Sequence, residues 1–186
     1  MQGELTADLT TLLGLFPRGE DLVARCERVR GNELPDTERA LLDHGNHMTE
    51  TVEVFWGEPV DVEVLDRRAE GARYARKILL RRRSNRAVVL FALVRLELGF
   101  LSEEVRGDIV SERIPLGRTL IEHGVLRHVR RVGIWKLKCG IELARHFSVV
   151  SGALVYGRTA LIHCGGAAAV ELLEIVPPMR RQEPIA

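Results

Sequence analysis

Residues 113–120 read Arg113-Ile114-Pro115-Leu116-Gly117-Arg118-Thr119-Leu120, where a charged segment ends and an amphipathic one begins. Pro115 has no backbone N–H and holds φ at about −65°, which suits the first turn of a helix. The N–H groups of Leu116, Gly117 and Arg118 are then unpaired, and such a helix start attracts anions. Gly117 would let a ligand come close to the backbone because it has no side chain. The stretch predicts a helix start at Pro115, either a plain one or part of an anion site.

The segments on either side of this helix start follow two hydrophobic periods. Alternation typical of strands occurs in residues 60–65, 74–82, 87–98, 125–137, 153–163 and 167–176. Helical spacing or helix caps occur in residues 36–42, 48–56, 102–110, 115–123 and 140–147. Tight turns join consecutive strands and the helices fall in groups, so we expect an α+β fold with a single antiparallel sheet of about six strands and flanking helices.

The chain is divided by pattern into three parts. Residues 1–34 show helical spacing before and after Pro17, which predicts a helical N-terminal extension. Residues 35–179 carry the strands and most of the helices, and residues 180–186 have the composition of a flexible tail.

Composition excludes several classes of protein. The chain has 186 residues, 46% of them hydrophobic, and a formal net charge of +1, which argues against a dedicated nucleic-acid binder and against disorder. No apolar run approaches the length of a membrane span, and the first residues do not resemble a signal peptide. The three cysteines and six histidines show no metal-ligand spacing. We therefore expect a cytoplasmic protein with no membrane, nucleic acid, metal or cofactor as partner.

Two charged residues stand on otherwise apolar strand faces. Arg76 shares a face with Ile78, and Glu174 shares one with Leu172 and Val176. A buried charge is costly unless it is paired. The two residues therefore predict either an internal Arg76–Glu174 salt bridge, an exposed sheet edge, or two contacts for a polar ligand.

At this point the chain resembles the chorismate lyase (chorismate–pyruvate lyase) family, in particular its branch from bacterial natural-product and phenolic-glycolipid pathways. The resemblance covers about residues 35 to 179, and its motifs occur in the family's order. They are residues 41–49, 57–60, 74–80, 114–118, 156–159 and 174–178.

The resemblance implies a closed pocket beneath helical flaps, and cofactor-free conversion of chorismate to a hydroxybenzoate, 4-hydroxybenzoate above all, and pyruvate. It implies that Arg76 grips a carboxylate, assisted by backbone N–H groups of Met48 and Leu116. It also implies that Glu174 meets the ring hydroxyl. Arg76 and Glu174 would be the catalytic pair, and the protein would be a monomer or a homodimer.

The remaining implied substrate contacts are Gly117, Arg158 and His47, and the chain departs from the family pattern near two of them. His47 stands where the family usually has Ser or Thr before Met-Thr, and Ala160 follows Arg158-Thr159 where an aromatic residue is common. These departures bear on the substrate and on the product isomer rather than on the fold.

Two other functions fit the same resemblance. UTRA effector-binding domains of transcription regulators share this fold and bind small anions without turnover. They follow a winged-helix domain of roughly 60 to 70 residues, and the 34 residues before Pro35 are fewer than that. A family member recruited to another biosynthetic reaction is the remaining alternative. We expect the lyase from sequence.

Overall fold

The computed structural model describes residues 5–125 and 127–179, and the predicted tail at 180–186 lies outside the described residues. Its centre is one antiparallel sheet with the strand order β1-β5-β6-β7-β4-β3-β2. The strands are β1 (Val23–Val29), β2 (Val60–Glu70), β3 (Arg73–Arg82), β4 (Val88–Glu97), β5 (Arg127–Cys139), β6 (Leu154–Cys164) and β7 (Ala167–Val176). The predicted α+β fold with a single antiparallel sheet is confirmed.

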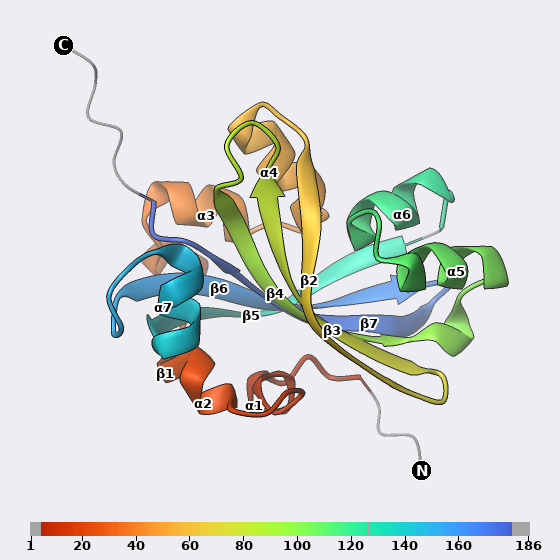
Figure 1. Ribbon diagram of the computed structural model, residues 1–186, viewed down its shortest axis with the longest axis horizontal. Helices are drawn as coiled ribbons and strands as arrows, with labels where there is room; N and C mark the ends of the chain where they lie inside the picture. The colour runs from red at the N-terminus through yellow and green to blue at the C-terminus, as the bar shows by residue number, and fades with distance from the viewer. Residues whose placement is uncertain (1–4, 126, 180–186) are drawn as a thin grey trace.

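Helices cover both faces of this sheet (Figure 1). The α-helices are α1 (Leu9–Leu13), α2 (Gly19–Leu22), α3 (Asp36–Leu42), α4 (Met48–Trp56), α5 (Glu103–Ser111), α6 (Leu116–Glu122) and α7 (Ile141–Phe147). Two short 3-10 turns, η1 (Gly31–Glu33) and η2 (Leu98–Phe100), complete the elements. None of the helices among the described residues is long and apolar enough to cross a membrane.

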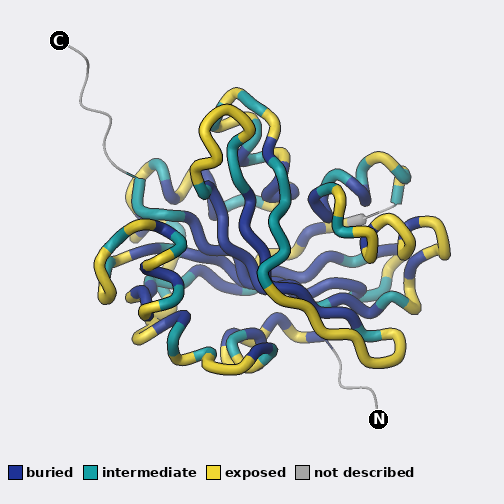
Figure 2. Tube along the Cα trace, viewed as in Figure 1, coloured by how far each residue is buried: buried dark blue, intermediate teal, exposed yellow. Residues whose placement is uncertain are grey.

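The sheet separates two hydrophobic cores. One core contains buried side chains of α3, α4, α5 and α6, and we call the sheet face beneath them the upper face. The other contains buried side chains of α1, α2 and α7 on what we call the lower face. Figure 2 shows the strands buried through the middle of the molecule and exposed mainly at the outer turns. Each central strand therefore presents buried residues on both sides, and its charged members need partners there.

Local signals in the sequence place several elements as predicted. The side chain of Ser102 accepts a hydrogen bond from Val105 N at 3.4 Å and caps α5. Helix α4 spans Met48–Trp56 and ends at Gly57, whose φ of 68° suits a residue without a side chain. Helix α6 begins directly after Pro115, as the opening stretch predicts.

The predicted helical extension is wrong for residues 23–29. This segment is strand β1, which pairs with β5, so the sheet has seven strands rather than about six. Val23 is buried, whereas the next five residues are exposed. Apolar residues at helical spacing therefore did not form a helix, because the segment gains backbone hydrogen bonds from the free edge of β5.

Candidate functional site

Arg76 is the most unusual polar residue on the upper face. It lies on β3 and has no exposed surface. Its Nη1 lies 3.5 Å from the Ile109 carbonyl oxygen, at the C-terminal end of α5. Its Nε and Nη2 are buried and have no hydrogen-bond partner. Burial lowers the pKa of the guanidinium from its usual value. A buried cation with two unused donors in a fork is suited to an anion that accepts two hydrogen bonds.

The acidic residue nearest to this cation is engaged elsewhere. Glu112 follows α5 with a φ of 60°, and its carboxylate accepts a short hydrogen bond from the Tyr74 hydroxyl. The other carboxylate oxygen accepts from Arg67 at 3.1 Å. Burial, together with the Glu112 contact, raises the pKa of Tyr74 to about 12. Glu112 therefore fastens the end of α5 to β2 and β3, next to Arg76, and leaves the donors of Arg76 unused.

Glu174 has a different partner from the one that sequence suggested. Arg158 Nε donates to Glu174 Oε2 at 2.7 Å, and both side chains are buried. The predicted alternative of an internal Arg76–Glu174 salt bridge is wrong, because β6 lies directly beside β7 and brings Arg158 opposite Glu174. Sequence reasoning proposed Arg158 as a substrate contact and did not anticipate this ion pair.

The rest of the Arg158 side chain holds the loop before α4. Its Nη1 donates to the His44 carbonyl oxygen at 3.0 Å, and its Nη2 donates to that of Asn46 at 3.1 Å. Nη1 also lies 3.2 Å from His44 Nδ1. Burial, and next the charge of Arg158, lower the pKa of His44. All three guanidinium nitrogens of Arg158 thus have partners, in contrast to those of Arg76.

Arg76 on β3 and Glu174 on β7 are separated by strand β4 on the upper face. Glu174 lies opposite Ala92 on β4, and Ala92 lies opposite Ile78, two residues from Arg76. Two strand spacings across the sheet and two residues along the strand put the Cα atoms of Arg76 and Glu174 about 12 Å apart. Ala92 contributes only a methyl group to the space between them. The two groups have separate partners and do not pair with each other, and their contacts with opposite ends of one ligand stay a prediction.

The two predicted helix starts lie against each other above this face. A side chain at Gly117 would bring its Cβ within 2.8 Å of Thr49 Oγ1 and 3.4 Å of His47 Cβ. Gly117 therefore allows α6 to approach α4 closely, and its predicted ligand contact stays a prediction. Met48 and Leu116 are the first residues of α4 and α6, and both are buried in the core of the upper face. An Arg118–Glu53 ion pair also joins the two helices.

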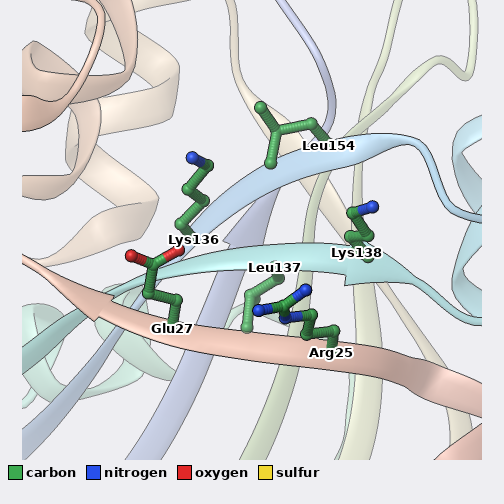
Figure 3. A pocket seen from close by; sticks show the side chains of 6 residues that line it. All are labelled: Arg25, Glu27, Lys136, Leu137, Lys138 and Leu154. Carbon is green, nitrogen blue, oxygen red and sulfur yellow. The ribbon is translucent and has the colours of Figure 1, made fainter.

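Two surface hollows are present, and neither is lined by Arg76 or Glu174. One, of about 170 Å³, is on the outer strands of the sheet (Figure 3). It is lined by Arg25, Glu27, Lys136, Leu137, Lys138 and Leu154. The other, of about 360 Å³, lies along α3 and α4 and includes His44 and Asn46 of the loop that Arg158 holds. Arg76 lines neither hollow. Its unpaired donors, rather than the size of an opening, define the candidate site.

Strand alternation placed Arg76 and Glu174 each on an apolar face of its own strand, and the structure puts both on the upper face. Sequence reasoning missed the Tyr74–Glu112 contact and the loop contacts of Arg158. Tyr74 has the same parity as Arg76 on β3, and this was the available signal. Within residues 5–125 and 127–179, no group of three or more His, Cys, Asp or Glu side chains could hold a metal ion.

Comparisons with known proteins support the fold. No protein-family model matches the sequence, and no curated protein matches it either. Among solved structures, PhnF from Mycobacterium smegmatis is similar over 74% of this chain and 69% of its own, at 10% identity and a TM-score of 0.55. A GntR-family transcriptional regulator from Enterococcus faecalis V583 is similar over 67% of this chain and 99% of its own, at 9% identity and a TM-score of 0.48. At 10% identity the similarity to PhnF establishes the fold alone.

Proposed function

We propose that this chain is a small-molecule binding domain of the UTRA type, which holds an anionic effector at Arg76 and does not convert it. The observation that carries the proposal is the fully buried Arg76 with two unpaired donors. Leaving donors unsatisfied in a core is costly, and a carboxylate ligand that accepts both hydrogen bonds removes the cost. The likeness to PhnF supports this proposal through the fold.

Chorismate lyase activity is the second candidate, and it is favoured by the position of Glu174. Glu174 and Arg76, whose Cα atoms lie about 12 Å apart on the same sheet face, could meet the hydroxyl and the carboxylate at the two ends of one ligand. The side chain of Glu174 is however already held by Arg158 at 2.7 Å. An acid or base that must exchange a proton with a substrate would have to do so from within this ion pair, which supports binding over catalysis.

Calorimetry with 4-hydroxybenzoate and chorismate tests the proposal. We expect wild-type protein to bind an aromatic carboxylate, and Arg76→Lys to bind it roughly 10 to 100 times more weakly, because an ammonium cannot make the forked contact. Arg83→Lys is the matched control, since Arg83 is exposed and pairs with Asp61. If the wild type and Arg76→Lys bind every tested acid with equal affinity, Arg76 does not contact the ligand.

Release of pyruvate from chorismate separates the two functions. We expect no release above the spontaneous rate, even when binding is saturated. Turnover by the wild type that is lost in Glu174→Gln would instead establish the lyase.

A further inference from the structure

Among the described residues, no strand pairs with the outer side of β1. Strand β1 pairs with β5 along one side, and it is the first strand in the sheet order. Its residues from Ala24 to Arg28 are exposed. An edge strand offers backbone N–H and C=O groups to a further strand, and proteins usually protect such an edge with charged side chains. The charges on β1 are arranged in a way that favours one particular partner.

That arrangement is symmetric about Cys26. An antiparallel copy of β1 centred on Cys26 would place Arg25 opposite Glu27 of the copy, and Glu27 opposite Arg25 of the copy. Centring the pairing on Arg25 or Glu27 would instead set that residue against its own copy, with like charges in contact. Opposite charges across paired strands are stabilising and like charges are destabilising. The sequence of the edge therefore selects one register.

The charged side chains next to the edge form no ion pair within the described residues. Neither Arg25 nor Glu27 has a side-chain hydrogen bond or ion pair there, although Glu27 lies opposite Lys136 on β5. Arg25 lies opposite Lys138 on β5, so its neighbour within the sheet has the same charge. Figure 3 shows Arg25, Lys136 and Lys138 around one hollow with Glu27 as the only acidic residue that lines it. A carboxylate supplied from outside would complement this group of cations.

We propose that β1 is the interface of a symmetric homodimer, in which two copies pair antiparallel at Cys26 and form one continuous sheet. The interface is isologous, because each copy supplies both Arg25 and Glu27 to the two reciprocal ion pairs. By strand alternation these two side chains lie on the side of the hollow, and Cys26 lies on the opposite side, facing its own copy. This proposal does not depend on the ligand of Arg76.

Charge exchange tests the pairing directly. We expect sedimentation of the wild type, under reducing conditions and over a concentration series, to show a monomer–dimer equilibrium. Arg25→Glu or Glu27→Arg alone should weaken the dimer at least about tenfold, because each change replaces both ion pairs by like charges. The double variant Arg25→Glu/Glu27→Arg restores opposite charges and should dimerise as the wild type does. Glu70→Arg, on the exposed end of the other edge strand β2, is the control and should have no effect.

The central cysteine gives a second measurement. Diamide should couple Cys26 to its copy, since the two thiols lose two protons and two electrons, which the diamide takes up. Cys139 and Cys164 are buried, so Cys26→Ser should abolish the covalent dimer while sedimentation still shows the noncovalent one. The single charge variants should reduce the coupling, and the double variant should restore it. A monomer at every concentration, or a dimer indifferent to the charge exchange, would overturn the proposed interface.

Discussion

Arg158 and Glu174 lie directly opposite each other on β6 and β7, and Nε of the arginine donates to Oε2 of the glutamate at 2.7 Å. The same guanidinium donates to the carbonyl oxygens of His44 and Asn46, in the loop that leads into α4. One buried side chain thus ties the sheet to the loop and through it to the helix start above the candidate site. All three guanidinium nitrogens of Arg158 have partners within the fold, whereas Nε and Nη2 of Arg76 have no partner among the described residues.

Replacing Arg158 alone should therefore destabilise the fold strongly. Arg158→Met leaves the carboxylate of Glu174 buried without its partner, and removing one member of a buried pair costs about 3–5 kcal/mol. Urea unfolding followed by circular dichroism measures the change. The double variant Arg158→Met/Glu174→Leu removes both charges and should lose less stability than Arg158→Met. If the loss of stability in the double variant equals the sum of the losses in Arg158→Met and Glu174→Leu, the two residues are not coupled.

Replacing Arg76 should increase the stability of the fold and abolish ligand binding. Arg76→Met keeps much of the side-chain volume and removes a desolvated charge with two unpaired donors, so we expect unfolding to cost about 1–3 kcal/mol more than in the wild type. Binding of aromatic carboxylates should be abolished in the same variant. Thermal and urea unfolding without ligand measure the first effect, and calorimetry measures the second. A destabilised Arg76→Met would mean that the guanidinium has favourable partners within the fold.

The Arg158–Glu174 pair also shows what the sequence could not provide. The strands at 153–163 and 167–176 were predicted with a tight turn between them. Regular pairing from Cys164 and Ala167 would set Arg158 opposite Leu173. The register shifts by one residue between Ile162 and His163, and Arg158 therefore lies opposite Glu174. A bulge of this kind depends on how the strands twist and pack, so alternation along a single strand does not reveal it.

Strand β1 illustrates the limit of hydrophobic spacing. Leu22, Val23, Cys26 and Val29 fit a helical period, but Leu22 ends helix α2 and the next residue begins the strand. Residues 24–28 of β1 are exposed on both sides of the strand, so no apolar alternation marks them. Strands such as β4 were predicted because alternation and flanking turns mark them. The central sheet was therefore predictable and its added edge was not.

A buried acid on the lower face should control the N-terminal segment. Glu171 has no exposed surface, and its Oε2 accepts hydrogen bonds from the backbone of Thr6 at 3.0 Å and of Ala7 at 2.9 Å. Its other oxygen pairs with Arg95 at 2.5 Å. Glu171→Gln leaves Arg95 without a counter-charge and should cost about 2–4 kcal/mol of stability. In Glu171→Gln, hydrogen exchange of residues 6–16 should rise more than that of the strands next to α4. Equal protection of residues 6–16 in the wild type and in the variant would contradict the anchoring role.

The loop before α4 should make stability depend on pH. The pKa of His44 is lowered, first by burial and then by the charge of Arg158, so the folded state favours the neutral ring. The unfolded chain takes up a proton near the ordinary pKa of 6.5, and the folded chain does so only at lower pH. The contribution of His44 is therefore complete above pH 6.5 and is lost as the pH falls through the lowered value. Urea midpoints on either side of pH 6.5 measure this loss. His44→Asn keeps an acceptor near the place of Nδ1 but cannot take up a proton, so it should lose less stability than the wild type as the pH falls. If stability depends on pH equally in both proteins, the effect belongs to other groups. His146 is one such group, because burial also lowers its pKa.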